Sequence, residues 1–163
     1  MPEKQTLERA QQAKREGKRP TTQAGEFIRE EMHHIREGKH GARSTKQAIA
    51  IGLSKARRAG VRLGPPPKGT KAKTRQSAAN ASRAARRGHR KPSGLRSRAI
   101  GRALKRESRR AATPTALARQ ARQAARRRGP VARKAAARKA VATKGPAVRR
   151  AAARKAAATR KAA

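Results

Sequence analysis

Few residues in this sequence could perform acid–base or metal chemistry. The chain contains no cysteine and no aspartate, and its four histidines are His33, His34, His40 and His89. A disulfide, a thiolate zinc site and a cysteine nucleophile are therefore excluded. His33 and His34 are adjacent, so on a helix they point about 100° apart and make a poor ligand pair. We find no catalytic constellation and predict a protein that is not an enzyme, with no metal and no cofactor.

The most specific local feature is the glycine-flanked basic loop of residues 38–43, which leads into a predicted helix. Backbone amides at a helix start, with the helix dipole behind them, favour a phosphate without reading base sequence. The alternative is an ordinary flexible turn in a basic protein. A second basic cluster follows at the end of that helix, where a solvated face is the alternative. We predict nucleic-acid contacts from Lys39, His40, Arg43 and Lys46 in the first cluster and from Lys55, Arg57, Arg58 and Arg62 in the second.

Further candidate contacts lie in the C-terminal half of the chain, where arginine and lysine alternate with alanine. The candidates are Arg86, Arg87, Arg126, Arg127, Arg128, Arg133, Lys134, Arg138, Lys139, Arg149, Arg150, Arg154 and Lys155.

The composition points to a polyanionic partner. Lys and Arg number 47 against 8 acidic residues, for a formal charge of +39, which few partners other than nucleic acid could neutralise. Leu, Ile, Val and Phe make up about 10% of the chain, well under the roughly 20% below which a highly charged sequence is expected to be disordered. The absence of Trp and Tyr weighs against a module that reads RNA by stacking bases.

Charge and proline divide the sequence into four regions. Seven of the eight acids fall in residues 1–37, and three consecutive prolines stand at 65–67, where they exclude a continuous helix. The predicted organisation is a weakly helical arm (1–21), a helix–loop–helix unit (22–63), a Pro-rich linker (64–69) and a basic tail (70–163).

Local signals define the two helices of the 22–63 unit. Bulky apolar residues recur at helical spacing between Phe27 and Ile35, with Gly38 as a stop. Ser44 and Gln47 form a capping box for the second helix, and Gly60 ends it. Small residues at 48, 52 and 56 allow close antiparallel packing. Because two helices are marginal alone, either a third helix near residues 6–16 joins them or the pair dimerises.

The basic tail contains a sixteen-residue repeat. Residues 129–144 and 145–160 match at 11 of 16 positions, and residues 113–128 form a degenerate copy. Each unit begins a potential helix with proline, but clustered like charges oppose that helix in water. We therefore expect a mainly α protein whose tail is largely disordered when free and gains helix on DNA. A weak amphipathic stripe over 95–104 could form a further short helix.

Two resemblances support this interpretation. The segment KQAIAIGLSKARRAG, residues 46–60, resembles one in small bacterial proteins labelled DNA-binding, and the likeness extends over residues 26–63. The Ala, Lys, Arg and Pro tail resembles those of bacterial linker-histone-like proteins, which implies condensation by charge neutralisation.

The sequence thus predicts sequence-nonspecific binding and compaction of DNA by a cytoplasmic, nucleoid-associated protein without a small-molecule substrate. No signal peptide, membrane span or membrane-active helix is indicated. Two alternatives remain: an RNA- or ribosome-associated protein, and an adaptor whose residues 22–63 bind a protein while the tail tethers it to nucleic acid. The acidic residues Glu30, Glu31 and Glu37 could serve the adaptor.

Overall fold

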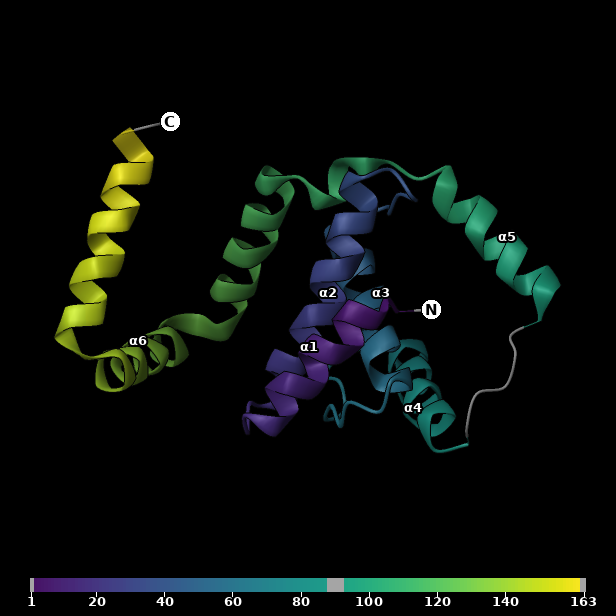
Figure 1. Ribbon diagram of the computed structural model, residues 1–163, viewed down its shortest axis with the longest axis horizontal. Helices are drawn as coiled ribbons and strands as arrows, with labels where there is room; N and C mark the ends of the chain where they lie inside the picture. The colour runs from purple at the N-terminus through teal and green to yellow at the C-terminus, as the bar shows by residue number, and fades with distance from the viewer. Residues whose placement is uncertain (1, 88–92, 162–163) are drawn as a thin grey trace. The chain divides into compact units, whose positions relative to one another are not determined.

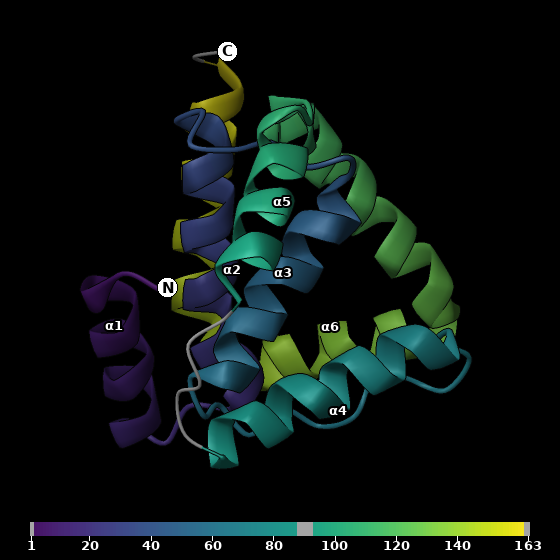
Figure 2. The same cartoon turned by 90° about the vertical axis from the view of Figure 1, so that its right-hand side faces the viewer.

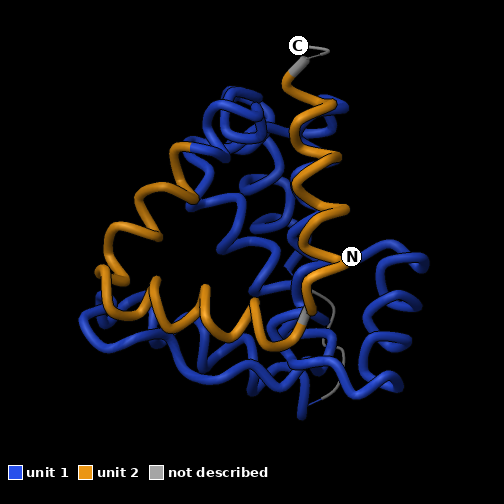
Figure 3. Tube along the Cα trace, turned by 90° about the vertical axis from the view of Figure 1, so that its left-hand side faces the viewer, with its two compact units in different colours: residues 1–118 blue, residues 119–163 orange. Residues whose placement is uncertain are grey.

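The computed structural model describes residues 2–87 and 93–161, and this part of the chain is helical, with no strand. The predicted mainly α class is confirmed. The elements are α1 (Lys4–Arg15), α2 (Pro20–Arg36), α3 (Thr45–Arg58), α4 (Ala72–Arg86), α5 (Gly94–Lys105), the 3-10 helix η1 (Arg109–Ala112) and α6 (Pro114–Lys161) (Figure 1). They divide into two compact units, residues 1–118 and 119–163 (Figure 3).

The centre of the first unit is the predicted pair of helices α2 and α3. Ser44 caps α3 by accepting a hydrogen bond from the Gln47 amide at 3.2 Å, and Gly60 follows the helix with a φ of 88°. The two backbones approach closely at Gly52, where a Cβ atom would lie 2.8 Å from the Ile28 Cα. A larger residue at position 52 would therefore force the helices apart.

A third helix packs against this pair, which is one of the two possibilities predicted from the sequence. Helix α1 lies along α2 (Figure 1), and its Ala10 joins Ala24, Phe27 and Ala56 in a buried cluster. The Phe27 ring is fully buried. Burial of an aromatic ring among three helices stabilises the unit where the helix pair alone would be marginal.

The first unit continues well past the Pro-rich linker. Helix α4 crosses the C-terminal end of α3 (Figure 2), and η1 places Ala111 and Ala112 in a second cluster with Met32 and Ile35. Close contact also forms at Gly41, where a Cβ atom would fall 1.8 Å from the Glu107 carbonyl oxygen. Only glycine fits there, so residues 107–112 are an integral part of this core.

The expectation of a largely disordered tail was wrong, because residues 114–161 are helical. Two glycines interrupt the helix, Gly129 (φ 74°, ψ 169°) and Gly145 (φ 64°, ψ 167°), each followed by proline. This backbone conformation is open almost only to glycine, and proline disfavours a helical residue before it. Each predicted repeat is thus one helix beginning with proline. The helix propensity of alanine outweighs like-charge repulsion here.

No helix of the described residues has the length and apolar character needed to cross a membrane.

Candidate nucleic-acid interface

Ion pairs are confined to the N-terminal third of the protein. Every ion pair among the described residues joins side chains between Glu3 and Lys55. Residues 56–163 contain 35 Lys and Arg but a single acid, Glu107. The cations that the protein neutralises internally and those that it leaves for a partner are therefore separated along the chain.

Two well-buried ion pairs connect α2 with Lys55 of α3. The Lys55 ammonium lies 3.0 Å from Glu30 Oε1 and 2.7 Å from Glu31 Oε2. Burial raises the pKa of Glu30, but hydrogen bonds from the Glu3 amide, Thr6 and Lys55 outweigh it and lower the pKa overall. Burial lowers the pKa of Lys55, yet the two carboxylates beside it raise that pKa overall. Lys55, a predicted nucleic-acid contact, is thus held inside the unit.

The predicted phosphate loop is also largely engaged within the protein. The amides of Gly41 and Ala42 donate to the carbonyls of Leu104 and Ser108 at 2.9 and 3.1 Å. Lys39 pairs with Glu3 and Glu37 at 3.2 and 3.1 Å. These two loop amides are therefore not free for a phosphate, and the Gln47 amide at the start of α3 donates to Ser44 Oγ.

His40 and Arg57, two other predicted contacts, also face the protein. His40 Nε2 lies 3.3 Å from Glu31 Oε1. The Arg57 side chain is buried and donates a hydrogen bond from Nη2 to the Gly64 carbonyl at 3.0 Å. The remaining predicted contacts of the helix pair are exposed: Arg43, Lys46, Arg58 and Arg62.

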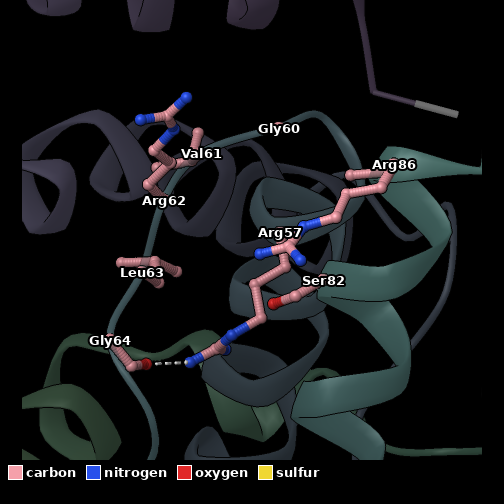
Figure 4. Close-up of a pocket in the computed structure, with 9 residues that line it drawn as sticks. Arg57, Gly60, Val61, Arg62, Leu63, Gly64, Ser82 and Arg86 are labelled. Carbon is pink, nitrogen blue, oxygen red and sulfur yellow. Dashed lines mark hydrogen bonds between the residues drawn. The ribbon is translucent and has the colours of Figure 1, made fainter.

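A basic pocket lies between α4 and the end of α3. It has a volume of about 660 Å³, and its charged lining residues are Arg57, Arg62 and Arg86. Figure 4 shows Arg86 reaching from α4 towards α3, while Arg62 extends away from Arg57. Ser82 adds a hydroxyl, and no acid lines the pocket. Arg57 donates to the Gly64 carbonyl, so Arg86 supplies the guanidinium group that this hollow offers to a phosphate.

All three arginines were predicted as contacts from the sequence, but the pocket was not, because α4 falls in the region that was expected to be a disordered tail. The signal that could have found α4 is its small residues at helical spacing, Ala78, Ala81, Ser82 and Ala85. Ala81 is 2% exposed, and its three companions are half-buried. Small side chains give a weak hydrophobic signal even where they pack a helix closely.

The predicted contacts from residue 86 onwards are all exposed. They comprise Arg86, Arg87, Arg126, Arg127, Arg128, Arg133, Lys134, Arg138, Lys139, Arg149, Arg150, Arg154 and Lys155. In the helix that begins at Pro130, a rotation of 100° per residue spreads the predicted contacts over about two-thirds of the helix circumference. Such a helix presents positive charge in most directions, so it suits a phosphate backbone more than a single groove edge.

Comparison with known protein families finds a match over the helix pair. Residues 19–69 match a family described as a family of unknown function (DUF6496). These residues comprise α2, the loop, α3 and the Pro-rich segment. No curated protein and no solved structure shows significant similarity to the chain.

Proposed function

We propose that this protein binds nucleic acid, duplex DNA in the first place, without reading its sequence, and compacts it by neutralising phosphates. The observation that carries the proposal is the array of exposed basic side chains after Lys55, where the described residues form no ion pair. Burying so many positive charges against a protein partner would carry a large desolvation cost. The phosphates of a nucleic acid instead neutralise these charges, and the counterions of the nucleic acid are released.

The amount of charge fits a duplex of modest length. Residues 38–163 carry 39 basic residues and one acid. At one charge per about 1.7 Å of B-DNA, a net +38 corresponds to roughly 65 Å, or about 19 base pairs. One molecule can therefore neutralise about two helical turns, which is consistent with a nucleoid-associated role.

The adaptor alternative loses its main support in the folded unit. Glu30 and Glu31, two of the acids proposed to attract a protein, are 5% and 0% exposed and pair with Lys55. The RNA alternative rests on the same charge as the DNA proposal, because phosphate contacts do not distinguish the two.

Fluorescence anisotropy with a labelled 30-base-pair duplex tests the proposal. If about eight side chains contact phosphates, the log–log salt dependence should have a slope near −7. Competition by unlabelled duplex DNA, ribosomal RNA and heparin at 0.15 M salt should rank the duplex first. A slope shallower than about −3 would contradict the electrostatic mechanism. Stronger competition by ribosomal RNA would favour the RNA alternative.

Two variants, each with one substitution, test whether the pocket contacts a phosphate. Arg86→Gln should weaken binding several-fold for all duplex sequences and make the salt slope shallower by about 1, as expected for one lost phosphate contact. Arg29→Gln is the matched control, since it also removes one positive charge, but from an arginine already paired with Glu26 at 3.1 Å. Equal effects of the two variants would show that the pocket is not a preferred contact.

A further inference from the structure

A second site, of different chemistry from the basic surfaces, gathers one acid and two histidines from α2 and the loop that follows it. Glu31 and His34 stand one turn apart on α2, and His40 comes from the loop that follows. One possible ligand atom from each of the three lies within 4.8 Å of the others. The two rings meet edge to face, with centroids 6.1 Å apart.

Glu31 is the central residue of this cluster. Its side chain is 1% exposed, and neither carboxylate oxygen accepts a hydrogen bond from any described residue. The Lys55 ammonium lies 2.7 Å from Oε2 and neutralises charge there, whereas Oε1 has only the His40 Nε2 beside it, at 3.3 Å. A buried carboxylate with unfilled acceptor positions is costly to the fold. A cation bound at Oε1 would fill the position that Lys55 does not reach.

The contacts of His40 leave one ring nitrogen directed at that carboxylate, and a contact with Glu3 orients the His34 ring. His40 Nδ1 lies 3.1 Å from the Gly41 carbonyl oxygen, which only accepts, so Nδ1 carries the proton. In a neutral ring Nε2 then has a free lone pair, facing Glu31 Oε1. His34 Nε2 lies 2.8 Å from Glu3 Oε1, which fixes that ring. Partners of this kind orient histidines that bind metals.

We propose that Glu31, His34 and His40 form a binding site for a divalent transition-metal ion, and that Zn²⁺ suits it best. Two imidazoles and one carboxylate are a common three-ligand set for zinc, with a fourth position left for water. Because Lys55 pairs with Oε2 of Glu31, Oε1 of the same carboxylate remains available to the ion.

Local charge also favours a cation here, despite the charge of the whole chain. The carboxylates of Glu3, Glu30 and Glu31 outnumber the ammonium groups of Lys39 and Lys55 that pair with them. With neutral histidines the cluster carries a net charge of −1. A dication there would link α2, the following loop and, through Glu3, the start of the chain.

Titration calorimetry of the full-length protein, stripped of metal and nucleic acid, with Zn²⁺ alone tests this site. We expect one ion per chain, and Co²⁺ in its place should give the visible absorption of a tetrahedral site. His34→Gln and His40→Gln should each weaken Zn²⁺ binding by about tenfold or more. The matched control is His33→Gln, because His33 is also on α2 but is 68% exposed and pairs with Glu37; it should bind like the unaltered protein.

Thermal unfolding provides a second measurement that does not depend on the heat of binding. Zn²⁺ should raise the unfolding temperature of the unaltered protein and of His33→Gln, but not that of His34→Gln or His40→Gln. The proposal is overturned if Zn²⁺ does not bind, or if all three histidine variants behave alike in both measurements.

Discussion

In residues 1–118 basic side chains accompany a buried core, whereas the described residues of 119–161 carry them on helices in which no buried cluster forms. The first unit buries Phe27 and Ile35 completely and contains all eight acids. The second has sixteen basic residues and no acid, and its Val131 is 82% exposed. Helix formation and core formation are therefore separate properties in this chain. Packing determines the first unit, and alanine-rich local propensity suffices for the second.

The strongest test of this difference is a pair of large-to-small substitutions, one in each unit. Phe27→Ala should lower the free energy of unfolding by about 3–5 kcal/mol, because it leaves a cavity among three helices. Val131→Ala should change it by less than about 0.5 kcal/mol. Urea unfolding followed by circular dichroism measures both. Similar losses would mean that the second unit has a core of its own.

Removal of residues 119–163 should separate binding from stability. The unfolding temperature of the remaining chain should change by less than about 2 °C, because both buried clusters lie within residues 7–117. Affinity for duplex DNA at 0.15 M salt should fall on the order of 100-fold, if about half of the phosphate contacts are lost. An unchanged affinity would place the binding surface entirely on the first unit.

Two glycine substitutions in neighbouring helices sharpen the account of the first core. Gly52→Ala should cost about 1–3 kcal/mol, because its methyl group would meet the backbone of α2. Gly25→Ala, in α2, meets nothing within 4 Å and should gain about 0.5–1 kcal/mol from helix propensity. Chemical denaturation should therefore give opposite signs. A gain at both positions would contradict the close helix crossing.

The acid dependence of stability should come from the first unit alone. The pKa of Glu30 is lowered from its ordinary value of 4.5, so its stabilising contribution is complete above pH 4.5 and is lost as the pH falls through its lower folded value. The pKa of Lys55 is raised from 10.5, so its contribution is complete below pH 10.5 and is lost as the pH rises through its higher folded value. Glu30→Gln should reduce the acid part of this dependence in urea unfolding. An unaltered pH profile would exclude Glu30 as its source.

Local sequence signals predicted α2 and α3 well but not what surrounds them. Ser44 with Gln47, and Gly60, act within one turn of a helix end, so their roles can be recognised in the sequence. The packing of α4 depends on Ala81, a small residue that gives little hydrophobic signal. The tail was expected to be disordered because its apolar content is low, but alanine needs no apolar face to form helix.

The candidate binding residues were also only partly predictable from the sequence. The exposed arginines were predictable from charge alone. The inward orientation of His40 and Lys55 was not, because it depends on how α2, α3 and the loop of residues 38–43 meet. Glu31 precedes His40 by nine residues, a separation that no helical period would bring together.

The Gly-Pro breaks at 129 and 145 make the tail modular. Each sixteen-residue unit, 129–144 and 145–160, carries five basic residues and begins at its own break. Duplication or loss of one unit would change the charge by five and leave every buried cluster of residues 7–117 untouched. Copy number could thus adjust the length of polyanion that one molecule covers, in equal steps and without any change to the folding of the rest of the protein.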